Sequence, residues 1–167
     1  MKKLVISLLI GFILVAPCLA GNLNISGRAG MYTPSGGSAS LMYGLGADYA
    51  LNQNLSVRAA VENTTYTVNN VSTSFTPVTL DLIYSQTVAE TLHPYLGAGV
   101  SYNTYNTGGV SSSTGGAQAE AGIRFELGGF SAGVEFRYML ADFNNGNSGS
   151  TTYNAYATGA FSQSLNI

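Results

Sequence analysis

Charge is scarce in this sequence, and that scarcity limits the surroundings in which it can fold. Only 8% of the 167 residues are Asp, Glu, Lys or Arg, against roughly a quarter in soluble globular domains. Hydrophobic residues nevertheless make up 46% of the chain. Tryptophan is absent, and there is one histidine and one cysteine. We therefore do not expect water to be the main solvent of this chain.

Long apolar runs are also missing beyond residue 20, so no segment there is long enough for a membrane-spanning helix. The N-terminus has a different pattern. Lys2 and Lys3 precede an apolar core over 4–16, and the small residue Ala20 follows it just before Gly21. This pattern predicts a secretory signal peptide over 1–20, cleaved after Ala20. An anchor helix is the alternative, but the run is short and Pro17 interrupts its end.

The single cysteine, Cys18, raises the alternative of a lipoprotein, although Pro17 rather than a small residue precedes it. Cleavage after Ala20 would remove this cysteine, so the mature chain would have no disulfide and no thiolate metal site. The mature chain would keep four arginines against eight acidic residues, a net charge of −4. We therefore expect no nucleic-acid partner.

From Leu23 onward, apolar residues recur with period two, which is the signature of β-strands. Between 40 and 51, for example, Leu41, Tyr43, Leu45 and Tyr49 alternate with small or charged residues. The same reading gives about eight expected strands, near 23–33, 40–51, 55–62, 78–85, 94–105, 117–126, 132–140 and 153–167. Most are long enough to cross a bilayer when tilted.

The segments between these strands alternate in length. Those near 34–39, 69–75, 106–116 and 141–152 are polar and mostly long, those at 52–54 and 128–129 are tight, and 87–93 is intermediate. Outer-membrane barrels have short periplasmic turns and longer outer loops. We therefore predict that 21–167 is all-β and forms an eight-stranded antiparallel up-and-down transmembrane barrel. A soluble β-sandwich also fits the alternation, but it would carry many more charges on its wet face and turns.

An eight-stranded barrel has an interior that side chains fill, so an open pore is not expected. The charged residues fall on the inward side of the alternation, and buried charges must be paired. We therefore predict a lumenal ion-pair network made by Arg28, Asp48, Arg58, Glu62, Asp81, Glu120, Arg124, Glu135 and Arg137.

Turn geometry predicts which of these charges lie together. A two-residue hairpin loop at 128–129 would place Glu120 opposite Arg137, with Arg124 diagonal to Glu135. Counting around the turn at 52–54 places Asp48 opposite Arg58, unless a bulge shifts the register. Inward glycines such as Gly97 and Gly99 would leave room for the long arginine side chains.

Catalysis and cofactors have little support in the sequence. His93 precedes Pro94 near a turn, and no hydroxyl and carboxylate set is apparent around it. Gly44-Leu45-Gly46 lies inside an expected strand with no helix after it, so it is not a dinucleotide motif. No cluster has metal-ligand spacing. We expect no enzyme activity, no cofactor and no metal, with a lipid-acting enzyme kept as an alternative.

Several segments resemble the small OmpA-type and OmpX-type outer-membrane barrels: GLGADYAL at 44–51, NLSVRA at 54–59, HPYLGAGV at 93–100 and GVEFRY at 133–138. The resemblance implies a closed eight-stranded barrel, insertion by the outer-membrane assembly machinery, and a role in envelope integrity, adhesion or host interaction. Two features depart from the family pattern. The chain ends at Ile167 rather than Phe, and no peptidoglycan-binding domain follows, so we do not carry over cell-wall tethering.

Together these observations predict a non-enzymatic barrel whose lumen is plugged by its own charged side chains. We expect it in the bacterial outer membrane, as a monomer among outer-membrane lipids. It would contribute to envelope structure, and 106–116 and 141–152 would be the surfaces for adhesion or ligand binding because they are rich in Asn, Gly, Ser and Thr. The alternative is that these two loops are flexible and solvated and bind no dedicated ligand. The alternative function is a narrow porin-like conduit for small solutes, gated by the lumenal ion pairs.

Overall fold

All regular structure in the described part of the chain is β-strand. The computed structural model describes residues 23–128, 130–143, 149–152 and 159–161. They form β1 (Leu23–Tyr32), β2 (Ser40–Ala50), β3 (Leu55–Val68), β4 (Val71–Ser85), β5 (Leu92–Thr107), β6 (Val110–Glu126), β7 (Phe130–Leu140), β8 (Gly149–Thr152) and β9 (Gly159–Phe161). The expected signal peptide and most of the expected strand at 153–167 lie outside these residues. The described residues contain no helix long and apolar enough to cross a membrane.

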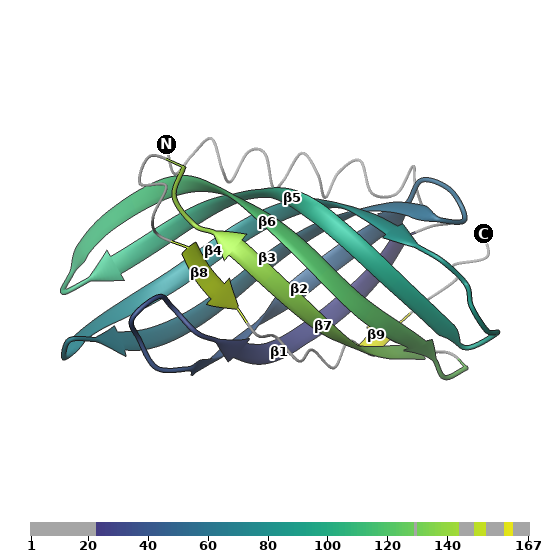
Figure 1. Ribbon diagram of the computed structural model, residues 1–167, viewed down its shortest axis with the longest axis horizontal. Helices are drawn as coiled ribbons and strands as arrows, with labels where there is room; N and C mark the ends of the chain where they lie inside the picture. Colours follow the sequence, from purple (N-terminus) through teal and green to yellow (C-terminus); the bar gives the residue numbers. More distant parts are fainter. Residues whose placement is uncertain (1–22, 129, 144–148, 153–158, 162–167) are drawn as a thin grey trace.

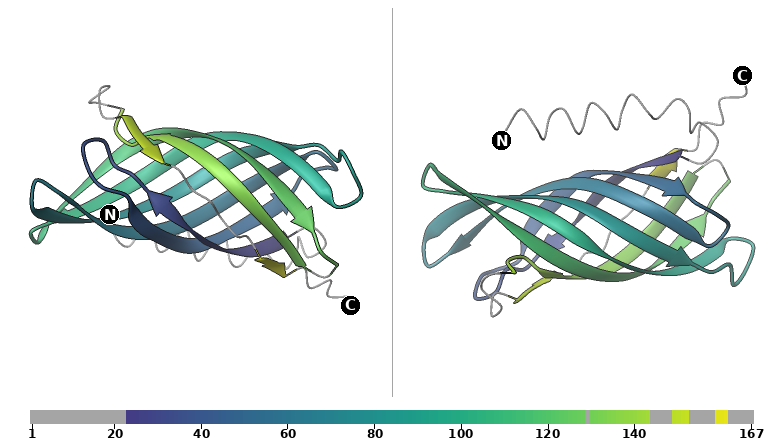
Figure 2. Two further views of the ribbon diagram at one scale, coloured as in Figure 1. Left: turned by 60° about the horizontal axis from the view of Figure 1, so that its bottom comes forward. Right: turned by 90° about the horizontal axis from the view of Figure 1, so that it is seen from above.

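The strands run up and down in sequence order, each antiparallel to the next from β1 to β7 (Figure 1). β9 pairs with both β1 and β7, so the row of paired strands returns to its start. β8 pairs with β7 farther along the same strand. Figure 2 shows the tilted strands curving around a common axis. The predicted antiparallel up-and-down topology is confirmed for the seven long strands.

Burial along each strand follows the predicted period of two, with the charged side inward and the apolar side outward as expected for a membrane barrel. Leu45 is 62% exposed and Leu96 is 64% exposed, whereas Arg137 is fully buried. On β7, inward Ser131, Glu135 and Arg137 alternate with outward Val134 and Phe136. This arrangement suits a wall whose outer face contacts hydrocarbon and whose inner face is polar.

The expectation that 69–75 and 106–116 are loops is wrong. The segment 69–75 contains only a two-residue turn at Asn69 and Asn70, with φ of 51° and 64°. The segment 106–116 likewise contains a turn at Gly108 and Gly109, with φ of 59° and 86°, and the rest is strand. Positive φ at both central residues is the geometry of tight hairpin turns, which Asn and Gly adopt readily. The polar composition therefore indicated hairpins, not long loops.

Cross-strand side-chain contacts explain why these polar segments remain extended. The hydroxyls of Thr73 and Thr107 lie 2.9 Å apart across β4 and β5, and Asn106 Nδ2 donates to Ser111 Oγ at 3.3 Å. Such pairs support a sheet as apolar pairs do.

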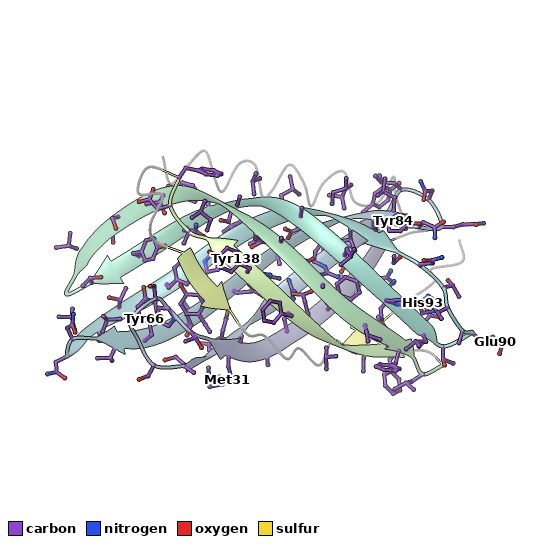
Figure 3. The ribbon with its side chains drawn as sticks, in the orientation of Figure 1. Met31, Tyr66, Tyr84, Glu90, His93 and Tyr138 are labelled. Atoms are coloured by element: carbon purple, nitrogen blue, oxygen red, sulfur yellow. The ribbon has the colours of Figure 1, made fainter. Side chains whose placement is uncertain are left out.

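The two ends of the barrel are distinguished by their connections. We call the end formed by 33–39, 69–70, 108–109 and 141–143 the Tyr66 end. The end formed by 51–54, 86–91 and 127–128 is the His93 end. Figure 3 shows Tyr66 near one end of the barrel, and His93 and Glu90 near the other.

Candidate functional site

Many of the polar side chains in the described part of the chain lie in the lumen. Two tight turns set the pairing registers of the strands that carry several of them, β2 with β3 and β6 with β7. At the first turn, Asn52 Oδ1 accepts hydrogen bonds from the backbone N–H groups of Asn54 and Leu55, both at 2.9 Å. The register that follows places Asp48 opposite Arg58, as predicted. At the second turn, Leu127 N donates to Phe130 O at 2.8 Å, and Glu120 lies opposite Arg137, also as predicted.

Arg137 is the centre of a connected set of ion pairs. Its side chain is fully buried and reaches Glu62 at 2.7 Å, Glu135 at 2.9 Å and Glu120 at 3.2 Å. These three carboxylates come from β3, β7 and β6. One guanidinium therefore joins acidic groups from opposite parts of the wall, which its fork of donors allows.

Arg58 and Arg28 extend the same set. Arg58 lies 2.7 Å from Asp48, 2.9 Å from Glu120 and 2.7 Å from Glu135. Arg28 contacts Glu135 and lies 3.6 Å from Glu62. Three arginines thus bridge four carboxylates, and all of these residues are at most 6% exposed. We call these seven residues the charged layer.

Two predicted members lie outside this layer of ion pairs. Arg124 has Gly133 opposite it, so Glu135 is diagonal as predicted, but no ion pair joins Arg124 to Glu135 in the described part of the chain. Glu135 contacts Arg28, Arg58 and Arg137 instead. Asp81 is opposite Arg58 in register, but Arg58 turns toward Asp48. The Asp81 carboxylate accepts a hydrogen bond from Gln118 Nε2 at 2.5 Å.

Sequence reasoning missed Tyr95 as a lumenal residue. Its hydroxyl donates to Glu135 Oε2 at 2.8 Å, and its ring centroid lies 5.3 Å from Arg58 Cζ, within cation–π range. The ring packs over Gly122, where a Cβ atom would overlap it. The available signal was parity, because Tyr95 falls on the same side of its strand as Gly97 and Gly99.

A second layer, also missed, fills the lumen toward the Tyr66 end. Phe75 stacks between Tyr32 and Tyr105, with ring centroids 5.0 Å and 4.9 Å away. Tyr66 approaches Phe75 edge-on at 6.5 Å. Met42, Met139 and Ala141 complete this cluster. We call these seven residues the aromatic layer. Phe75, Tyr32 and Met42 are at most 1% exposed, so this layer is an apolar core inside the barrel.

His93 lies in β5 rather than in the turn, and polar groups do gather around it. Thr87 Oγ1 lies 3.1 Å from its Nδ1, and Glu126 Oε1 lies 3.4 Å from its Nε2. The expectation that no hydroxyl and carboxylate set surrounds His93 is therefore wrong, because β6 brings Glu126 beside β5. Thr87 is exposed, and the Glu126 side chain is 53% exposed. Among the described residues, no group of three His, Cys, Asp or Glu side chains is placed to hold a metal ion.

Comparison with known proteins supports the architecture. Residues 19–162 match the family described as outer membrane protein beta-barrel domain. Among solved structures, Neisserial surface protein A superposes with a TM-score of 0.63 at 18% identity, over 83% of this chain and 94% of that one. No curated protein sequence matches the chain significantly.

Two further structures share the fold. Ail of Yersinia pestis, solved in complex with the heparin analogue sucrose octasulfate, gives a TM-score of 0.55 at 14% identity, over 83% of this chain and 96% of that one. The outer membrane enzyme PagL gives 0.54 at 15% identity, over 81% and 97%. At these identities the similarity shows the fold alone.

Proposed function

Because this chain belongs to the outer membrane protein β-barrel family, we propose that it is a non-enzymatic outer-membrane barrel with a plugged lumen. In this proposal β8 and β9 belong to one eighth strand, residues 1–20 are a signal peptide cleaved after Ala20, and the assembly machinery inserts the mature chain as a monomer. Its tasks are envelope structure and the binding of a surface ligand at the Tyr66 end, which faces outward.

The observation that carries the plugged lumen is the succession of two buried layers across it. The charged layer joins strands from opposite parts of the wall through Arg137, and the aromatic layer lies between it and the Tyr66 end. A barrel of this size has little interior space beyond its side chains. Both layers would have to move before a solute could pass.

The competing function is a narrow conduit gated by the same ion pairs. Planar-bilayer recordings of purified protein test the two. We expect no sustained single-channel steps from the native chain. Sustained steps whose conductance changes in Arg137→Ala, but not in Arg124→Ala, would overturn the plug and favour the conduit. The Arg124 variant is a matched control because it removes the same charge from a residue outside the ion-pair network.

Ligand binding is proposed for the Tyr66 end on the basis of its surface chemistry. The structured hairpins around 69–70 and 108–109 present a defined surface there, together with the segment that begins at Ala141. Ail was solved with a sulfated heparin analogue. The segments 33–39, 63–79, 101–117 and 141–152 contain no Lys, Arg or His. A polyanion would lack charged partners there, so the ligand class differs from that analogue.

The fold likeness to PagL keeps a lipid-acting enzyme as the remaining alternative, with Thr87, His93 and Glu126 as its only candidate set in the described chain. Solvent exposure of Thr87 and Glu126 argues against it, because catalytic sets work best in water-excluded sites. Expression of the native chain and of His93→Ala should leave the same lipid profile in the envelope. A lipid product that disappears in the variant would contradict the non-enzymatic proposal.

A further inference from the structure

A hollow at the Tyr66 end has a lining that specifies a chemical class of ligand. Its volume is about 410 Å³, and it lies beside the aromatic layer. This size falls within the range of about 300 to 1,000 Å³ that is typical of small-molecule sites. Its walls come from five strands and from both longer connections at this end, which include Ser35 and Asp142.

Hydroxyl groups dominate the polar lining. Thr73, Thr107, Ser112 and Thr114 all line the hollow. The Thr73 and Thr107 hydroxyls are 2.9 Å apart, and Thr114 Oγ1 donates to Ala141 O at 2.6 Å. A hydroxyl both donates and accepts hydrogen bonds. A wall of them suits a ligand that itself carries many hydroxyl groups.

Asp142 is the only charged residue in this lining, and its position is held on both sides. Ala141 O accepts from Asn103 Nδ2 at 2.8 Å, and Phe143 N donates to Gly115 O at 2.9 Å. The intervening carboxylate is therefore attached to a backbone anchored to the barrel wall. A carboxylate accepts hydrogen bonds from neighbouring hydroxyls, and such charge-assisted bonds are the strong ones.

Three tyrosine rings, those of Tyr32, Tyr66 and Tyr105, border the hollow. Tyr32 and Tyr105 each turn one ring face to Phe75, with interplanar angles of 29° and 27°. Tyr66 and Tyr105 remain half-buried in the hollow. They can pack against the apolar C–H groups of a ring while their hydroxyls form hydrogen bonds.

A second hollow adjoins the first near the end of β3. It shares Tyr66 and Val68 with the first and is lined by Ser38, Ser40, Asn69 and Asn70. Its polar groups are neutral amides and hydroxyls. A saccharide of more than one ring could therefore contact neutral polar groups in both hollows.

We propose that the Tyr66 end binds a neutral saccharide, with hydroxyls and the Asp142 carboxylate as hydrogen-bond partners and Tyr66 and Tyr105 as apolar packing surfaces. This inference rests on the proposed function, because it names the ligand class of the outward-facing end. The absence of Lys and Arg from this end disfavours anionic glycans.

The full chain in lipid nanodiscs can be tested against immobilised lactose, maltose and N,N′-diacetylchitobiose oligomers, with sucrose octasulfate as the anionic comparison. We expect binding to at least one neutral glycan and none to the sulfated sugar. Asp142→Asn and Thr73→Val should each weaken this binding about tenfold, which corresponds to the loss of one hydrogen bond to the ligand. Glu126→Gln makes the same carboxylate-to-amide change at the His93 end and should leave the affinity unchanged.

Heat-dependent gel mobility establishes that each variant is folded before binding is compared. Binding to no neutral glycan, or equal affinity in the native and Asp142→Asn proteins, would overturn the saccharide site. Adhesion of expressing cells to a host-cell layer then separates this inference from the proposed function. Adhesion that survives enzymatic removal of surface glycans overturns the saccharide inference and leaves a surface-binding function standing. Adhesion lost with the glycans supports both, and no adhesion to intact cells overturns both.

Discussion

The charged and aromatic layers occupy successive levels of one lumen but obey different physical rules. In the charged layer, Arg137 contacts three carboxylates, so each buried charge depends on several others. In the aromatic layer, Phe75 contributes ring contacts and apolar volume without any charge. Loss of one charge leaves its partners uncompensated, whereas loss of one ring leaves a void. Substitutions should therefore distinguish the layers.

Arg137→Ala should have the largest effect on stability. It leaves Glu62, Glu120 and Glu135 buried with fewer cationic partners, and breaking a buried pair in this way costs about 3–5 kcal/mol. Urea unfolding in lipid vesicles measures the change in the free energy of unfolding. Arg124→Ala removes the same charge from outside the network and should cost far less. Equal losses in the two variants would show that the network does not stabilise the barrel.

Phe75→Ala should have the next largest effect. The ring is completely buried between two tyrosines, and its loss should cost about 3 kcal/mol from lost burial and the void left behind. The same unfolding measurement applies. Phe136→Ala is the matched control, because Phe136 faces outward and is 45% exposed. A larger loss for Phe136 than for Phe75 would contradict the assignment of the aromatic layer to the core.

Glu126→Gln should have the smallest effect, below about 1 kcal/mol, because solvent screens exposed ion pairs. Its carboxylate is 3.4 Å from His93 Nε2 and its side chain is 53% exposed. Glu120→Gln makes the same change on the same strand inside the charged layer and should destabilise the protein clearly more. If the two variants unfold at the same urea concentration, burial would not be what separates these carboxylates.

Local patterns in the sequence were sufficient for the wall and for two cross-strand pairs. Alternation assigned Arg58 and Arg137 to the inside, and short turns set the registers opposite Asp48 and Glu120. Such pairs are separated by few residues, so a turn of known length determines which side chains face each other. The same logic failed at 106–116, because Ser, Thr and Gly are common to loops and to polar hairpins.

Counting residues around a turn could not predict which side chains meet across the lumen. Arg28 and Glu135 are 107 residues apart in sequence yet form an ion pair. Their meeting depends on the curvature of the wall and on which rotamers the neighbouring arginines adopt. For the same reason, the diagonal from Arg124 to Glu135 held in register but not as an ion pair.

By itself, the sequence determined the strand pattern, the apolar outward face and the inward placement of the charges, because each depends on period-two alternation along one strand. Only the tertiary structure decided that Glu135 is shared by three arginines, that Tyr95 joins them, and that Tyr32, Phe75 and Tyr105 stack beneath a polar hollow. Those contacts arise when the sheet curves and brings non-adjacent strands to within a side chain's reach, a distance that no local pattern encodes.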